Sequence, residues 1–89
     1  ISSAQSLKKN SATISWKKIE RAEGYQITYS TSKSFENEKS ITIKGDITSK
    51  TIKNLTAGNK YYFKVRAFRM LDDAVYGNYS SIKEVTIKR

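Results

Sequence analysis

The sequence lacks cysteine, histidine and proline, and these absences narrow its chemistry before any pattern is considered. Without cysteine it has no disulfides or thiolate metal sites, and without histidine it lacks the commonest general base and metal ligand. Most routes to catalysis are therefore closed. No apolar run approaches the roughly 20 residues of a membrane-spanning helix. No signal peptide opens the chain, and we expect it to be a piece excised from a larger protein.

The length limits the architecture. Eighty-nine residues suffice for one domain with a two-layer core, but not for a second domain or an enclosed active site. We expect a free energy of unfolding within the usual range of about 5–15 kcal/mol.

Positive charge dominates the composition, since 17 Lys and Arg against 8 Asp and Glu give a formal net charge of +9. The cations are scattered, with pairs at Lys8-Lys9, Lys17-Lys18 and Lys88-Arg89. This distribution does not favour a specific nucleic-acid site. The diffuse field should attract polyanions such as anionic cell-wall polymers weakly and in a salt-sensitive way.

The clearest strand lies in residues 60–68, after a turn in which Gly58 is free to adopt positive φ. Apolar residues recur there at every second position, as in a strand with one face on a core and the other in water. The inward set is Tyr61, Phe63, Val65 and Ala67, and the outward set is Tyr62, Lys64, Arg66 and Phe68.

Six further segments read as short strands, and no segment has a convincing helical period. They are residues 1–7, the stretch with Ala12, Ile14 and Trp16, the stretch with Tyr25, Ile27 and Tyr29, the pair Ile41 and Ile43, residues 48–53 with Ile52, and residues 83–88 with Val85 and Ile87. Seven strands at a spacing of roughly 8–12 residues predict an all-β, seven-stranded antiparallel immunoglobulin-like sandwich. The longest connection is 69–79, from Arg69 to Tyr79.

Strand direction has a consequence for the chain ends. If each strand reverses direction, the seventh is parallel to the first, so the chain enters at one pole and leaves at the other. The domain would then be an end-to-end connector on the order of 35 Å long, from the rise of about 3.3 Å per residue in a strand.

Several of these residues together resemble the fibronectin type III domain, over nearly the whole chain. They are Trp16, the run from Gly24 to Tyr29, and Leu55 followed three residues later by Gly58 and six later by Tyr61. The resemblance implies that the Tyr61 hydroxyl bonds back to the preceding turn. The expected structural core is Trp16, Tyr25, Ile27, Tyr29, Leu55, Gly58, Tyr61, Phe63 and Val65.

Two runs are similar to modules of secreted and surface-anchored proteins of Gram-positive bacteria: Tyr-Tyr-Phe-Lys-Val-Arg-Ala at 61–67 and Tyr-Gly-Asn-Tyr-Ser at 76–80. Such modules occur beside glycoside hydrolase, carbohydrate-binding and adhesion domains. The resemblance therefore implies an extracellular, secreted or cell-wall-attached protein. Ala57 stands where this family usually has proline, which should loosen the turn by about 0.4–1 kcal/mol.

Four aromatic residues are candidate ligand contacts. Tyr76 and Tyr79 could form a stacking platform for sugar rings or a partner chain, and Tyr62 and Phe68 could form an exposed patch on the outward face. The competing interpretation, which we favour, is that Tyr76 and Tyr79 close the end of the core. Tyr62 and Phe68 would then serve cross-strand pairing.

Other motifs favour structural roles. Lys44-Gly45-Asp46 resembles an integrin-recognition tripeptide, but Gly-Asp is common in turns. Asp72-Asp73 with Glu84 supplies neither the six or more oxygens of a calcium site nor carboxylates placed across a cleft. The glycosylation sequons at 54–56 and 78–80 would be irrelevant in a bacterial source.

The leading hypothesis is a non-catalytic spacer or scaffold module of an extracellular or cell-surface bacterial protein, either a carbohydrate-active enzyme or an adhesin. Its partners would be neighbouring domains of the same polypeptide, with polysaccharide or anionic cell-wall polymer as further candidates. We expect no cofactor, no specific nucleic acid, no membrane insertion and a monomer in isolation. The alternative is a module that binds polysaccharide, cell-wall polymer or a host protein through residues 69–79. An enzyme ranks a distant third.

Overall fold

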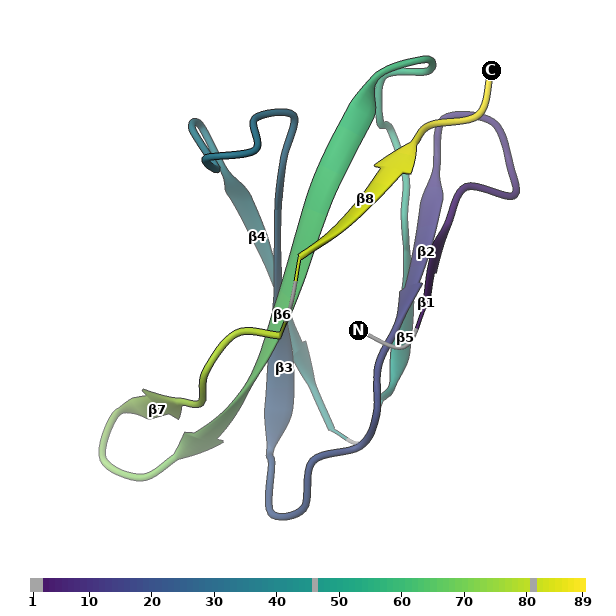
Figure 1. Cartoon of the computed structure of the whole chain (residues 1–89). Coiled ribbons are helices and arrows are strands. Elements are labelled where there is room, and N and C mark those ends of the chain that lie inside the picture. Colours follow the sequence, from purple (N-terminus) through teal and green to yellow (C-terminus); the bar gives the residue numbers. More distant parts are fainter. Residues whose placement is uncertain (1–2, 46, 81) are drawn as a thin grey trace.

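Two antiparallel sheets pack face to face in the computed structural model, which describes residues 3–45, 47–80 and 82–89 (Figure 1). One sheet has the order β1-β2-β5, and the other has the order β4-β3-β6 with β7 and β8 both paired to β6. The strands are β1 (Ser3–Gln5), β2 (Ala12–Ser15), β3 (Gly24–Ser30), β4 (Lys39–Lys44), β5 (Ser49–Ile52), β6 (Lys60–Met70), β7 (Ala74–Tyr76) and β8 (Lys83–Thr86). The predicted all-β sandwich is confirmed.

Strand β6 organises the larger sheet. It pairs with β3 along most of its length, from Ser30↔Tyr62 to Gly24↔Phe68. On its other edge it pairs with β8 near its start and with β7 near its end. Its inward side chains alternate as predicted, because the burial pattern along the strand has a period of two from Tyr61 to Val65.

The prediction that residues 69–79 form one long connection is wrong. Strand β6 continues to Met70, and β7 returns beside it as a hairpin in which Phe68 pairs with Tyr76 and Met70 with Ala74. The turn is closed by the Leu71 amide, which donates to the Asp73 carbonyl at 3.1 Å. The described residues therefore contain eight strands, one more than the sequence indicated.

The core lies between the sheets and includes nearly all the residues expected there. Trp16 and Tyr25 have ring centroids 5.4 Å apart, and the Ile19 amide donates to the Tyr25 hydroxyl at 2.9 Å. Tyr29 is only half-buried and packs against Phe63, with the ring centroids 5.8 Å apart. The buried residues of this core are Ala12, Ile14, Trp16, Tyr25, Ile27, Ile43, Ile52, Leu55, Tyr61, Phe63, Val65, Val85 and Ile87.

The turn before β6 has the geometry that the resemblance implied. The Thr56 amide donates to the Tyr61 hydroxyl at 3.0 Å. Gly58 has a φ of +82°, a conformation that side chains bearing a Cβ rarely adopt. Its amide donates to the Ile87 carbonyl at 2.8 Å, which joins the turn to the chain after β8.

Strands β1 and β8 run in the same direction and end at the same pole, as expected for an end-to-end connector (Figure 1). The Asn10 amide donates to the Lys88 carbonyl, and the Lys88 amide donates to the Ser6 hydroxyl at 2.8 Å. The principal extents are 42 × 24 × 20 Å, somewhat longer than the estimate from strand rise. Residues 1 and 2 of the predicted first strand lie outside the described residues.

Removing the Tyr61 hydroxyl should destabilise the domain. Tyr61→Phe deletes the hydrogen bond from the Thr56 amide while keeping the ring, so we expect the free energy of unfolding to fall by about 1 kcal/mol. Urea denaturation of the wild type and the variant measures this difference in the free energy of unfolding. Tyr62→Phe, one residue along and on the opposite face of the strand, is the matched control and should stay within about 0.5 kcal/mol of the wild type. Equal losses in both variants would show that the hydrogen bond is not stabilising.

Candidate functional site

The outer face of the larger sheet is covered, contrary to the prediction that it meets water. Phe68, expected to be exposed, is only 4% exposed, and Thr28 and Ser30 are also buried. Phe68 lies opposite Gly24, where a Cβ would come within 2.6 Å of the Phe68 ring. Because Gly24 has no side chain, the ring of Phe68 can lie across the neighbouring strand, so Phe68 is not available as a surface contact.

Residues 77–80 fold back along β6 and bring Tyr79 onto this outer face. The Gly77 amide donates to the Ala67 carbonyl at 2.9 Å, and the Ser80 amide donates to the Val65 carbonyl at 2.7 Å. The Tyr79 hydroxyl then lies 3.1 Å from the Thr28 hydroxyl. Tyr79 therefore packs on the outside of the sheet instead of closing the end of the core.

Two cations of β6 insert between aromatic rings on this face. The Lys64 ammonium nitrogen lies 4.2 Å from the ring centroids of both Phe35 and Tyr79. The Arg66 guanidinium carbon lies 3.8 Å from the Tyr76 ring centroid and 4.5 Å from that of Tyr79. We call the five residues Phe35, Lys64, Tyr79, Arg66 and Tyr76 the cation–aromatic ladder.

The ladder is anchored to the sheet below it. The Arg66 Nε donates to the Gln26 Oε1 at 2.7 Å. Phe35 has a φ of +60°, unusual for a bulky residue. Each cation–π contact contributes about 0.5–1 kcal/mol at an exposed site and about 2 kcal/mol when desolvated. The ladder therefore fixes residues 77–80 and the β3–β4 loop on the sheet.

The cations of the ladder also limit which ligands its aromatic rings can bind. A sugar ring stacks on a free aromatic face, but the Lys64 ammonium group and the Arg66 guanidinium group both lie against the ring of Tyr79. Tyr76 has Arg66 against one face and Phe68 as a tilted neighbour at 6.0 Å. Tyr62 is half-buried beside Glu84 in the β6–β8 pairing. The four candidate aromatic residues do not form one open platform.

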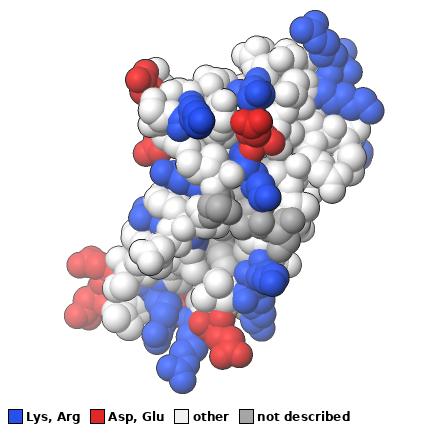
Figure 2. Space-filling view, viewed as in Figure 1, with Lys and Arg blue, Asp and Glu red and all other residues white. Residues whose placement is uncertain are grey.

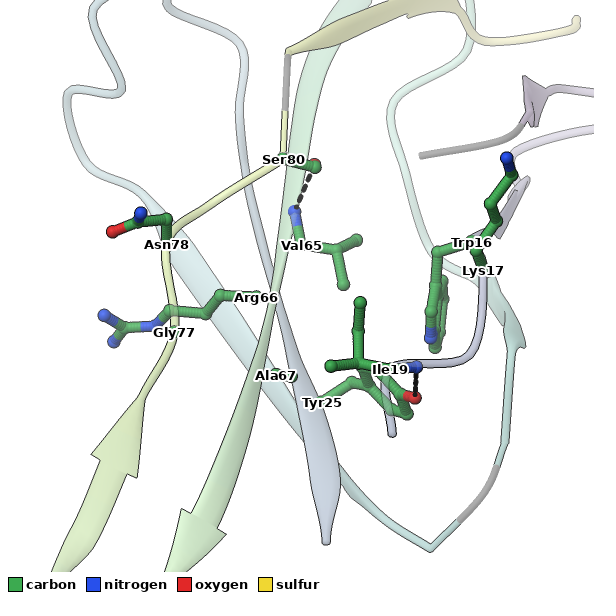
Figure 3. Close-up of a pocket in the computed structure, with 10 residues that line it drawn as sticks. All are labelled: Trp16, Lys17, Ile19, Tyr25, Val65, Arg66, Ala67, Gly77, Asn78 and Ser80. Atoms are coloured by element: carbon green, nitrogen blue, oxygen red, sulfur yellow. Dashed lines mark hydrogen bonds between the residues drawn. The ribbon is translucent and has the colours of Figure 1, made fainter. Parts of the chain in front are cut away.

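A cavity of about 390 Å³ opens between the sheets beside the ladder (Figure 3). Trp16, Ile19, Tyr25 and Val65 point toward one another around it, whereas the Arg66 side chain points away toward the outer face. Trp16 is 6% exposed, and its indole nitrogen is buried without a hydrogen-bond partner among the described residues. Periodicity along single strands could not predict this cavity, because its lining combines residues that follow β2 with residues 77–80.

The remaining sequence motifs do not assemble into a reactive site. Among the described residues no group of three or more acidic, cysteine or histidine side chains could hold a metal ion. Glu84 forms an ion pair with Lys60 at 3.7 Å, and Asp72-Asp73 lies in the β6–β7 turn. Asp46 of the Lys44-Gly45-Asp46 tripeptide is outside the described residues. In the described ranges no helix is long and apolar enough to cross a membrane.

Comparison with known proteins agrees with this geometry. The sequence model of the fibronectin type III family matches residues 2–81. The chain belongs to the fibronectin type III family. No curated protein matches it significantly. Fibronectin type III domains are generally non-catalytic scaffold or binding modules, and most occur in extracellular or surface proteins.

Similar solved structures share the fold of this fibronectin type III domain. The FN1–FN3 domains of chicken CNTN1 match with 24% identity and a TM-score of 0.83, over 98% of this chain and 29% of that chain. The fn3 domain of human contactin 1 has 20% identity and a TM-score of 0.79, over 98% and 74% of the two chains. A structure described as a myokine has 22% identity and a TM-score of 0.77, over 98% and 92%. At these identities the likeness shows the fold alone.

Replacing the central cation of the ladder should destabilise this fibronectin type III domain. Arg66→Met keeps the aliphatic stem but removes both cation–π contacts and the hydrogen bond to Gln26. We therefore expect the free energy of unfolding to fall by about 1–2 kcal/mol in urea. The matched control is Arg69→Met, three residues along on the exposed part of β6, which should change stability by less than about 0.5 kcal/mol. If both variants unfold at the same urea concentration, the ladder contributes nothing to stability.

Proposed function

We propose that this fibronectin type III domain is a non-catalytic spacer or scaffold module of a larger extracellular or cell-surface protein. The observation that carries the proposal is the elongated sandwich, 42 Å in its longest dimension, whose first and last strands run in the same direction. Such a module separates whatever precedes it from whatever follows it. Its distinctive aromatic residues serve the core and the cation–aromatic ladder, which supports a structural role.

The cellular setting is a second part of the proposal. We infer a secreted or cell-wall-attached protein of a Gram-positive bacterium, either a carbohydrate-active enzyme or an adhesin. The support is the resemblance of residues 61–67 and 76–80 to modules of such proteins. Neighbouring domains of the same polypeptide would be its main partners. The domain itself would be a monomer without specific affinity for nucleic acid.

A domain exchange in the parent protein tests the spacer function. Replacing residues 1–89 with an unrelated fibronectin type III domain of equal length should preserve the parent's activity. Its maximum dimension in small-angle scattering should also stay the same, because only length and stiffness matter for a spacer. A flexible Gly/Ser segment of the same residue number is the control and should change the dimension and lower the activity. Loss of activity in the domain exchange as well would refute the spacer role.

The β6–β7 hairpin favours a second candidate function, the binding of a partner protein. Met70, Leu71 and Val75 are exposed, Leu71 by 68%. A shallow cavity of about 220 Å³ lies below the hairpin, between Ile19 and Ala67. Exposed aliphatic groups around a hollow suit an apolar protein surface better than a sugar, which is recognised by free aromatic faces.

The hairpin candidate predicts a localised response to a protein ligand. In an amide chemical-shift titration with collagen as a host matrix protein, shifts should cluster in residues 69–79 and disappear in the double variant Leu71→Ser/Val75→Ser. Leu7→Ser, at a similarly exposed leucine on the other pole, is the control and should keep them. A soluble neutral polysaccharide should cause no shifts. Shifts that persist in the double variant would exclude the hairpin as the binding site.

A further inference from the structure

A polar groove of about 670 Å³ lies at the pole where β1 and β8 end. It runs between the β1–β2 turn and the start of the connection after β5. These segments stand side by side because β2 and β5 are neighbours, with Thr13 paired to Thr51. The described residues that line it are Leu7, Lys8, Lys9, Asn10, Ser11, Thr13, Thr51, Lys53 and Asn54. We call this feature the polar-end groove.

The described lining of the polar-end groove contains lysines but no carboxylate. Lys8, Lys9 and Lys53 are all exposed. Two more cations reach the same pole, because the Lys88 ammonium group donates to the Leu7 carbonyl at 3.4 Å and Arg89 follows it. Figure 2 shows blue atoms at the upper right, beside the C-terminal end of the chain, whereas red atoms lie at the upper left and over the upper centre.

None of the described acidic residues lines the polar-end groove, and four of the seven lie at the other end of the sandwich. Glu20 and Glu23 lie in the connection between β2 and β3, and Asp72 and Asp73 lie in the β6–β7 turn, both at the opposite end of the sandwich. The local field in the polar-end groove is positive because its described lining has three lysines and no carboxylate, although Glu36 and Glu38 lie in the β3–β4 loop and Glu84 in β8.

The groove combines mobile cations with fixed hydroxyl groups. The Thr13 and Thr51 hydroxyls lie 3.0 Å apart across β2 and β5. Asn10 and Asn54 have φ angles of 58° and 62° and mark the tight turns on either side. Ammonium groups and hydroxyls can donate hydrogen bonds to anionic oxygens that pass along the groove.

The donor set indicates which anion fits. Arginine binds both carboxylate and phosphate with a bidentate guanidinium in a fixed geometry, whereas lysine binds phosphate as a point charge that does not require one direction of approach. All cations in the described lining of the groove are lysines. That lining also contains no aromatic side chain on which a nucleic-acid base could stack. We propose that the polar-end groove binds a flexible linear polymer whose charges are phosphate groups and which carries no nucleobases.

This inference goes beyond the spacer function and does not depend on it. It assigns the attraction for polyanions to one site, the polar-end groove, instead of to the net charge of the whole domain. The proposal can therefore fail while the spacer function holds. A spacer that carries this groove would attach to an anionic phosphate polymer at one pole.

Two charge-matched triple variants test the proposal against linear inorganic polyphosphate of about 15 units. Lys8→Gln/Lys9→Gln/Lys53→Gln removes the groove lysines, and Lys17→Gln/Lys44→Gln/Arg69→Gln removes three exposed cations from the opposite pole. Both variants have the same net charge. We expect the groove variant to bind at least tenfold more weakly than the control variant, by calorimetry at low salt. The slope of log affinity against log salt should fall by about 2 in the groove variant.

Three outcomes would overturn the proposal. Equal loss of affinity in the two variants would show that only the overall field attracts the polymer. Equal affinity for polygalacturonate of similar charge would show that phosphate is not recognised. Tighter binding of a DNA oligonucleotide would assign the groove to nucleic acid. Amide shifts of the wild-type domain with polyphosphate should map to residues 7–13 and 51–54, which tests the location without any substitution.

Discussion

Strand β6 is the element on which the rest of the structure depends, because both of its faces are occupied. Its inward residues, Tyr61, Phe63 and Val65, form the centre of the core. Its outward cations, Lys64 and Arg66, hold together the cation–aromatic ladder. Because the ladder binds residues 77–80 and the β3–β4 loop to the sheet, one strand determines both the packing between the sheets and the covering of the outer face.

The sequence predicted the part of this arrangement that follows from alternation along one strand. Period-two patterns identified the inward face of β6 and the positions of Trp16 and Tyr25. The environment of Phe68 could not be read in this way, since its burial requires the absent side chain of Gly24 on the neighbouring strand. The ladder depends in addition on Phe35 and Tyr79, which come from distant segments. Local periodicity describes which face a residue occupies, whereas burial on an outer face depends on what folds over it.

The same distinction explains why the candidate binding residues changed character. Tyr76 and Tyr79 were expected in a connection, either open to a ligand or closing the end of the core, and Phe68 was expected on a strand face that meets water. Once those segments lie on the sheet, the rings contact cations and each other. Among the described residues, the aliphatic side chains of the hairpin and the lining of the polar-end groove are exposed, and strand alternation indicates neither of them as a site.

Charge at the polar-end groove has an energetic consequence for the isolated domain. Lys8, Lys9 and Lys53, with Lys88 and Arg89 nearby, repel one another most strongly at low ionic strength, where the screening length exceeds about 10 Å. The described lining offers no carboxylate to offset this repulsion. A bound phosphate polymer would supply the missing negative charge and relieve the repulsion, so binding and stability are linked.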